Sequence, residues 1–369
     1  MPTKFKRTPI FAFLILVISC CALSAQEKES ASGEIAKLRA RLDALEMKTD
    51  GDIEVEPKML TRGKWVSSFD ILTMTVRDSA FEYGVTDIGG VQDRGVVGTV
   101  LSLGGNYSSG IRLSFGRQIG SNGPVVSFRH LNFFSNASES VAGALRATVV
   151  SSDNNENNDS DNTSGTETVT PDDRATSVDA LHDFSLRTFD IELAQAFNVS
   201  DALDVKVNSA IRIADVDSYQ EVTYRGGDFQ TAFTPFQESF FDGAGVVLGG
   251  QMTWKFSNWL SLQYGLSGGA LLGRMQTRTF IPDDEPGVPT DLTYSETRLT
   301  PLIETRVALM FHRQIGRFHV DLGGGYEFAN MFNLADQRVF TDSHIEAQNA
   351  HLVGDLSMDG FFTRVTIRR

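Results

Sequence analysis

The strongest constraint on this chain is an alternation of apolar and polar residues that recurs along most of its length. In residues 203–213, for example, Val205 and Val207 alternate with Asp204 and Lys206. The same period appears in four other segments, at 188–197, 303–312, 318–328 and 361–368. Successive side chains of a β-strand point to opposite faces, so each segment predicts a strand with one apolar and one charged face.

The chain after residue 65 is therefore predicted to be all-β. Weaker alternating segments occur at 65–76, 96–104, 109–117, 124–134, 219–232, 243–256, 259–272 and 293–300. Together with the clear segments they indicate roughly 12–14 strands, and no segment there has the period of a helix of ordinary length. The clear segments are about 9–11 residues long, which is the length that a tilted membrane-spanning strand needs.

Two architectures suit such strands in an exported protein. In a soluble sandwich the apolar face points inward, whereas in an outer-membrane barrel it meets lipid and the charged face lines a lumen. Strand length and aromatic residues at strand ends, such as Trp65, Trp254 and Trp259, favour the barrel. We therefore expect a transmembrane antiparallel β-barrel over residues 64–369, preceded by a short N-terminal helix.

Residues 1–25 have the organisation of a secretory signal peptide. Lys4 and Lys6 lie in a basic start, residues 10–23 are apolar, and small residues lead to a cleavage point after Ala25. The alternative interpretation is an N-terminal anchor helix, but the apolar stretch is short for a membrane span. The segment predicts export, and removing it leaves a mature chain without cysteine.

The two cysteines, Cys20 and Cys21, lie inside this signal segment. Residues 17–20 resemble a lipoprotein processing box, in which Cys20 would carry lipid; the interpretation we favour is that both are ordinary apolar residues removed with the peptide. An exported chain without disulfides has to find its stability in a large core, a closed sheet or oligomerisation. The formal net charge is −14, so no basic face for nucleic acid is expected.

Residues 26–63 are predicted to form a short periplasmic helix followed by a linker. Two heptads carry apolar residues at positions a and d, namely Ile35, Leu38, Leu42 and Leu45. One interpretation is a small homo-oligomerisation bundle, and the other is a lone amphipathic helix, because two heptads are marginal for an isolated coil.

Residues 151–183 form a polar, acidic insertion between predicted strands. They hold nine acidic residues and one basic residue, Arg174, and we expect them to form an extracellular loop. Their alternating Asp and Asn residues resemble a calcium loop, but the required glycine and bidentate glutamate are missing. A solvated loop is therefore favoured, and loose divalent-ion or lipopolysaccharide-bridging contact is the alternative. The partners expected for the barrel are outer-membrane lipid and lipopolysaccharide.

The predicted lumen face carries charges of both signs, and we expect eleven residues to line a pore. They are Arg112, Asp190, Glu192, Asp204, Lys206, Arg212, Glu304, Arg306, Asp321, Glu327 and Arg364. Opposing charges across a constriction would set ion preference. The same residues could instead pair with each other and stabilise the wall, and the two roles are compatible.

Two other patterns contain residue types that are used in catalysis or metal binding. Residues 265–269 match the G-x-S-x-G pattern around Ser267, but that motif requires a strand-to-helix turn, and this segment reads as a strand. His312 and His319 fall on the lumen face without other ligands near them in sequence. We therefore expect no catalytic residues, no bound metal and no cofactor.

Short motifs in a fixed order give the chain a family resemblance. They are Phe189-Asp190-Ile191-Glu192, Phe241-Asp242-Gly243-Ala244-Gly245 with Gly249-Gly250, Leu260-Ser261-Leu262, Pro301-Leu302-Ile303-Glu304-Thr305-Arg306, Gly325-Tyr326-Glu327-Phe328 and Gly360-Phe361-Phe362-Thr363-Arg364. Over residues 184–369, and more loosely 65–135, the chain resembles the Legionella-type major outer-membrane pore-forming proteins. It departs from many barrels by ending in Ile367-Arg368-Arg369 instead of an aromatic residue.

The resemblance implies a β-barrel pore in the outer membrane and no particular substrate. The function we expect from the sequence is passive diffusion of ions and small hydrophilic solutes. The alternative is a structural or adhesive surface barrel whose lumen is plugged.

Overall fold

The computed structural model describes residues 65–79, 81–86, 99–103, 105–119, 123–148, 174–227, 229–282, 289–340 and 349–369. The signal peptide at 1–25, the helix and linker at 26–63 with its four heptad residues, and residues 151–173 of the acidic insertion lie outside the described residues. In the described part of the chain, no helix is long and apolar enough to cross a bilayer.

The described residues form one sheet of thirteen strands, in line with the predicted all-β class. The strands are β1 (Trp65–Asp78), β2 (Glu82–Thr86), β3 (Val100–Ser102), β4 (Ser108–Gln118), β5 (Val125–Ala147), β6 (Arg174–Ser200), β7 (Leu203–Gly226), β8 (Phe229–Phe233), β9 (Phe236–Lys255), β10 (Leu260–Ile281), β11 (Thr290–Ile315), β12 (Phe318–Phe340) and β13 (Asn349–Arg368).

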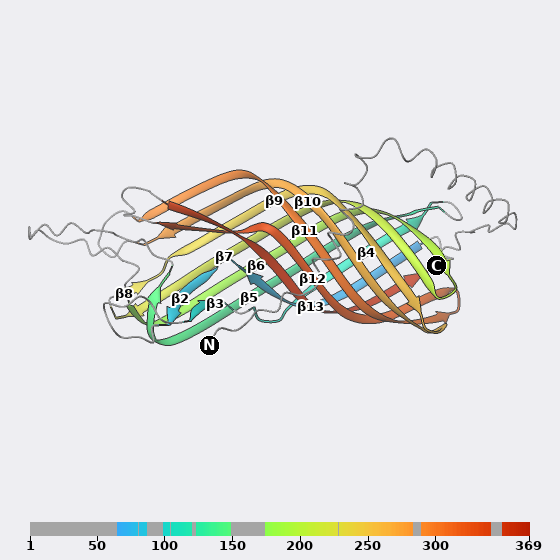
Figure 1. Cartoon of the computed structure of the whole chain (residues 1–369), viewed down its shortest axis with the longest axis horizontal. Helices are drawn as coiled ribbons and strands as arrows, with labels where there is room; N and C mark the ends of the chain where they lie inside the picture. Colours follow the sequence, from blue (N-terminus) through green and yellow to red (C-terminus); the bar gives the residue numbers. More distant parts are fainter. Residues whose placement is uncertain are drawn as a thin grey trace, which may run out of the picture. The chain divides into compact units, whose positions relative to one another are not determined.

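Ten of these strands close into a ring. The order runs β1-β13-β12-β11-β10-β9-β7-β6-β5-β4, and β4 pairs with β1 to complete it, every neighbouring pair being antiparallel. Figure 1 shows these strands winding diagonally around the barrel. The short strand β2 pairs with the C-terminal end of β5 and with β3, and β8 pairs with the C-terminal end of β7.

The two ends of the barrel differ. At one end, two-residue turns at 201–202 and 316–317 and the segment 256–259 connect the strands, and Trp65 and Arg369 exchange backbone hydrogen bonds there. We call this the short-turn end. Outer-membrane barrels have short turns on the periplasmic side and longer connections outside the cell, so in such a barrel we expect the short-turn end to face the periplasm.

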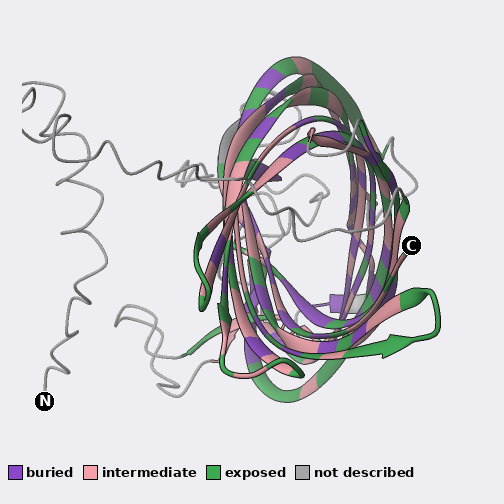
Figure 2. Cartoon of the chain, turned by 90° about the vertical axis from the view of Figure 1, so that its right-hand side faces the viewer, coloured by how far each residue is buried: buried purple, intermediate pink, exposed green. Residues whose placement is uncertain are grey.

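Around the short-turn half, the outward side chains form an apolar belt. On β6 they are Phe189, Ile191, Leu193 and Phe197, each more than two-fifths exposed. Trp65, Trp254 and Trp259 are exposed near the short turns, and Trp65 stacks on Phe115. Figure 2 shows buried and exposed residues alternating along the strands, as expected when each strand has two faces.

In the half away from the short turns the two faces exchange character. On β6, Asp179, Asp183 and Arg187 point outward, while Phe184 and Leu186 are buried inside. The outward face there suits water, so this half projects beyond the belt that would contact lipid. Residues 174–183, predicted as part of a loop, are strand residues of β6. Ala175, Val178 and Ala180 are buried inside, whereas Asp179 and Asp183 lie on the outer face that contacts water.

His182 lies inside this projecting half, outside the apolar belt. It is 5% exposed, its Nε2 atom is 3.0 Å from Ser218 Oγ, and its ring lies beside those of Phe81 and Phe184. Burial lowers the pKa of His182 to about 4, against a smaller opposing effect of Asp183. Since the unfolded pKa is about 6.5, the folded state disfavours the charged imidazole.

A charged residue placed in the apolar belt should destabilise the barrel. Ile211, on β7, is 59% exposed and points outward, so Ile211→Arg is expected to destabilise the folded barrel by about 2–4 kcal/mol in a bilayer. The control is Ser185→Arg, which also points outward but lies in the polar half. Folding yield into lipid vesicles and urea midpoints measure both. Equal losses would contradict the position of the belt.

Acidification should loosen the projecting half through His182. Stability is fully present above pH 6.5 and is lost as pH falls towards 4, by up to about 3 kcal/mol at roughly 1.4 kcal/mol per pH unit. His182→Gln keeps a neutral hydrogen-bonding side chain, so it is expected to flatten this dependence. Denaturant midpoints between pH 7 and 4 provide the measurement. Identical slopes for the two proteins would rule out His182 as the cause.

Candidate functional site

A layer of buried charges crosses the inside of the barrel at the level of the apolar belt. We call it the ion-pair layer, and it comprises Asp70, Arg112, Arg129, Asp190, Glu192, Lys206, Arg212, Glu304, Arg306, Glu327 and Arg364. These side chains come from β1, β4, β5, β6, β7, β11, β12 and β13. Each lies on the inward face because the apolar residues beside it occupy the outward face.

One half of the layer is built around Asp70 and Arg112. Arg364 donates two hydrogen bonds to Asp70, from Nε at 2.7 Å and Nη2 at 2.6 Å. Arg112 reaches Asp70 at 3.3 Å and holds both oxygens of Glu327, at 2.6 and 2.9 Å. Asp70 is 1% exposed and Arg112 is 7% exposed, so these pairs form away from water, where charge-assisted bonds are strong.

The other half is built around Asp190. Arg129 donates to it from Nε at 2.9 Å and Nη2 at 2.6 Å, and Arg212 donates from Nε at 2.8 Å and Nη2 at 3.0 Å. Arg212 also pairs with Glu304, which accepts a hydrogen bond from Ser267 Oγ at 3.1 Å. Asp190 is fully buried, so two guanidinium groups compensate its charge.

All eleven residues predicted to line the lumen lie on the inner face of the barrel. Nine of them belong to the ion-pair layer. Asp204 and Asp321 lie nearer the short turns, where they pair with Lys255 at 2.6 Å and with Arg368. The structure therefore brings the predicted residues together mainly as partners of each other.

Two members of the layer, Asp70 and Arg129, were not predicted. Both lie in strands whose alternation was recognised only weakly, within 65–76 and 124–134. In each strand, one charged residue among mainly uncharged neighbours was the only indication that the residue faces the lumen. Asp70 directly opposes Arg112 in the β1–β4 register, a pairing that strand order reveals and a single strand does not.

Above the ion-pair layer, towards the projecting half, apolar side chains fill the barrel. We call this the apolar layer; its members include Leu72, Met74, Phe133, Phe184, Leu186, Val216, Phe241, Leu271, Met275, Leu302, Met358 and Phe362, all at most 5% exposed. The cavity left beside the ion-pair layer is only about 60 Å³, which is room for no more than a few water molecules. The described side chains therefore occupy the barrel interior at this level.

Below the ion-pair layer lies a cavity of about 860 Å³, which we call the vestibule. Its lining includes Asp201, Ala202, Ser257 and Asn258 from the short turns, so it reaches the short-turn end. The ion-pair layer contributes Arg306 and other residues to its inner end.

Three side chains of the vestibule region have the order of a serine hydrolase triad. Ser261 Oγ lies 2.7 Å from His312 Nε2, and His312 Nδ1 lies 2.7 Å from Asp321 Oδ1. Ser261 is completely buried, however, so its hydroxyl is not available to a substrate, and Asp321 is shared with Arg368. Ser267 lies within strand β10 and not at a strand-to-helix turn. Among the described residues, no group of three or more His, Cys, Asp or Glu could hold a metal ion.

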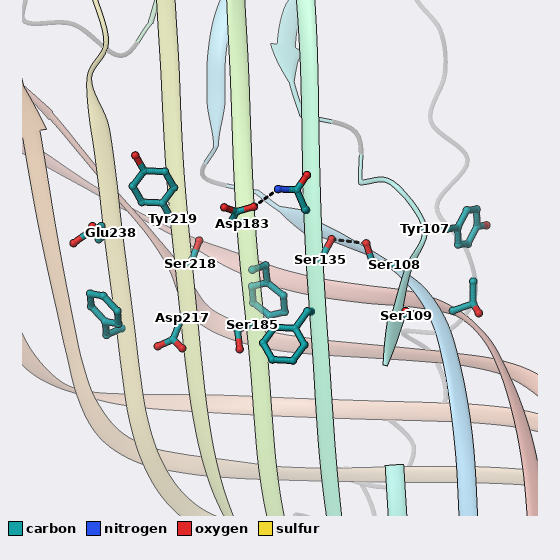
Figure 3. Close-up of a pocket in the computed structure, with 15 residues that line it drawn as sticks. Tyr107, Ser108, Ser109, Ser135, Asp183, Ser185, Asp217, Ser218, Tyr219 and Glu238 are labelled. Atoms are coloured by element: carbon teal, nitrogen blue, oxygen red, sulfur yellow. Dashed lines mark hydrogen bonds between the residues drawn. The ribbon is translucent and has the colours of Figure 1, made fainter. Parts of the chain in front are cut away.

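The outer wall carries a separate groove of about 660 Å³ just above the apolar belt. Figure 3 shows Asp183, Asp217 and Glu238 on neighbouring strands along it, with Tyr219 between Glu238 and Asp183 and Tyr107 at one side. Asn136 donates a hydrogen bond to Asp183, and Ser108 donates one to Ser135 at 3.1 Å. This groove therefore presents carboxylates and aromatic rings at the boundary between the apolar and polar outer faces.

Sequence comparison identifies the class. Residues 88–368 match the family described as the Legionella pneumophila major outer membrane protein precursor, and the chain belongs to that family. This confirms the resemblance noted from the sequence motifs and places the protein in the outer membrane. No curated protein matches the chain significantly.

Several solved structures show low similarity to the chain. The outer-membrane protease OmpT of Escherichia coli is 9% identical, with 85% of this chain and 99% of that chain covered and a TM-score of 0.43. The Pseudomonas putida toluene transporter TodX is 10% identical, with 82% and 89% covered and a TM-score of 0.26. A Pseudomonas aeruginosa FadL homologue is 7% identical, with 82% and 90% covered and a TM-score of 0.23.

Removing one partner from the ion-pair layer should destabilise the barrel far more than removing an exposed charge. Arg112→Ala leaves Glu327 and part of Asp70 uncompensated, so we expect a loss of about 3–5 kcal/mol. Arg187 pairs on the outer wall with Asp215 and Asp217 and has a side chain 49% exposed, so Arg187→Ala should change stability by less than about 1 kcal/mol. Urea unfolding in detergent, followed by heat-modifiable gel mobility, compares them. A similar small effect for both would show that the buried pairs contribute little.

Proposed function

We propose that this protein is an outer-membrane barrel with a closed lumen, which displays a rigid β-structure outside the cell. The supporting observation is the filling of the barrel interior by two successive layers. The ion-pair layer is bonded across the barrel from wall to wall, and the apolar layer above it is almost fully buried. Ten strands enclose a much narrower interior than the 16 to 18 strands of porins with aqueous channels, so side chains can fill it.

The second candidate is the passive pore expected from the sequence. Its support is the vestibule, which already provides a polar space from the short-turn end to the ion-pair layer. Conduction of ions and small hydrophilic solutes would then require the apolar layer to move. Phe133 and Phe241, at 0% and 1% exposed, lie in that layer and would have to be displaced.

We propose a non-enzymatic role. The support is local: Ser261 is inaccessible, and Ser267 donates its hydroxyl hydrogen bond to Glu304 within a strand. Neither serine is presented to a substrate in the described structure. The proposed role needs neither a cofactor nor a metal ion in the barrel interior.

We also propose lipopolysaccharide and outer-membrane lipid as partners of the outer wall. Carboxylates of the groove, such as Asp183 and Glu238, lie next to exposed Phe134 and Phe240, so divalent cations could bridge them to lipid phosphates. If divalent cations form the bridge, chelation should release copurified lipopolysaccharide from the wild type. The variant Asp183→Asn with Glu238→Gln should lose lipopolysaccharide without chelation. Retention of lipopolysaccharide by this variant would show that any bridging involves other residues. Homo-oligomerisation through Ile35, Leu38, Leu42 and Leu45 stays a prediction, which chemical cross-linking can test.

Planar-bilayer recording tests the closed lumen. We expect no steady channel steps from the wild-type protein, whereas Phe133→Ala with Phe241→Ala, which hollows the apolar layer, should produce them. The matched control is Phe134→Ala with Phe240→Ala, since these neighbouring rings point outward and are 56% and 41% exposed. Heat-modifiable mobility confirms that each protein has folded before recording.

Steady conductance from the wild-type barrel would favour the passive pore instead. In that case the two outward substitutions should leave the conductance unchanged, and the two inward substitutions should increase it.

A further inference from the structure

The ion-pair layer has one positive charge more than it has carboxylates. Its cations are Arg112, Arg129, Lys206, Arg212, Arg306 and Arg364, and its carboxylates are Asp70, Asp190, Glu192, Glu304 and Glu327. Five of the cations form ion pairs within the layer. Arg306 forms none with the described residues, and its one hydrogen bond there runs from Nη2 to Gln251 Oε1 at 3.3 Å.

The surroundings of Arg306 are repulsive to a cation. The like charges of Arg364, Arg129 and Arg112 act on it. The opposing charges of Glu327, Asp70 and Glu192 also act on it, but each of these carboxylates is already held by another cation of the layer. Arg306 is half-buried at the inner end of the vestibule, and a charge partly withdrawn from water without a partner is costly. An anion that enters the vestibule would supply the negative charge that Arg306 lacks.

The fold makes room for Arg306 in this position. Gly265 opposes Arg306 in the β10–β11 register and opposes Gln251 in the β9–β10 register. A Cβ atom at Gly265 would lie 3.0 Å from Arg306 Nε and 3.1 Å from its Cγ, closer than such contacts ordinarily are. The Arg306 side chain thus lies against Gly265, and the Gln251 amide oxygen accepts one hydrogen bond from its guanidinium group.

Arg306 lines the vestibule, and the vestibule wall is basic. Cationic lining residues are Arg112, Arg129, Lys206, Lys255, Arg306, Arg313, Arg364 and Arg368, whereas the acidic ones are Glu192, Asp201 and Asp321. Six of the eight cations are held in ion pairs, which leaves Arg306 and Arg313 without a carboxylate partner among the described residues. A concave site lined by one sign of charge concentrates ligands of the opposite sign.

We propose that Arg306, with Arg129 and Arg364 beside it, forms an oxyanion-binding site at the inner end of a vestibule open to the periplasm. A guanidinium fork matches the oxygens of a carboxylate or a phosphate. The vestibule, at about 860 Å³, is of the size that accommodates a small organic molecule. The ligand is therefore a soluble periplasmic compound with a phosphate or carboxylate group, and binding it is independent of whether the lumen conducts.

Titration of the folded mature protein in detergent tests this site. Inorganic phosphate and citrate are the two probes, and chloride at equal ionic strength is the comparison. We expect phosphate or citrate to raise the unfolding temperature of the wild type, and Arg306→Gln to weaken binding at least tenfold. The control Arg313→Gln removes a vestibule cation that does not belong to the ion-pair layer, and it should weaken binding less than threefold.

A stability measurement without ligand separates binding from a structural role. Because Arg306 is uncompensated, Arg306→Gln should leave the unfolding midpoint unchanged or raise it, in contrast to Arg112→Ala. Equal stabilisation of the wild type and Arg306→Gln by the probes would overturn the proposal, as would chloride acting as strongly as phosphate and citrate. No stabilisation of the wild type by either probe would also overturn it. None of these outcomes depends on conductance, so the closed-lumen proposal is tested separately.

Discussion

Closure of the sheet is the constraint on which the rest of this structure depends. Every strand of the ten-stranded ring has a hydrogen-bonded neighbour on each side, and β1 completes the ring by pairing with both β4 and β13. Within hydrocarbon no water can satisfy an exposed sheet edge, so only a closed ring leaves no unpaired backbone groups. Closure also creates an interior, and the sequence must then specify what occupies it.

The chemical character of the inner face changes along the barrel axis. Where the outer face is apolar, the inner face carries charges, and where the outer face is polar, the inner face is apolar. Phe189 and Asp190 illustrate the first arrangement, and Asp183 and Phe184 the second. The same period of two serves both halves because only the identity of the two faces changes. A barrel can thus extend past the bilayer with a core like that of a water-soluble β-protein.

The ion-pair layer contributes more to the specificity of strand arrangement than to the free energy of folding. Taking charges out of water removes much of what their attraction gains, and replacing such pairs by apolar residues is often neutral. Their bonds do connect strands that are distant in the chain, as Arg112 on β4 does with Glu327 on β12. Contacts of that kind fix which strands face each other across the barrel. The uncompensated Arg306 departs from this pattern, and for that reason it carries the proposal of a ligand site.

The sequence by itself determined the local features. The alternation specified strands, the phase of each alternation placed all eleven predicted residues on the inner face, and short motifs identified the family. The sequence did not reveal that residues 174–183 continue β6, because this segment combines a polar outer face with small or polar inward residues such as Ala180 and His182. Nor did it reveal Asp70 and Arg129 as partners in the layer.

The contacts across the barrel interior follow from the fold of the whole sheet, and the residue pattern of single strands does not contain them. These contacts depend on how many strands close the ring and on which side chains meet across it. Asp190, for example, is bonded by Arg129 from one neighbouring strand and by Arg212 from the other, while Glu304 reaches Arg212 from β11, three strands away around the ring. Strand periodicity carries information about faces, but distances across a barrel follow from closure, which is a property of the whole sheet.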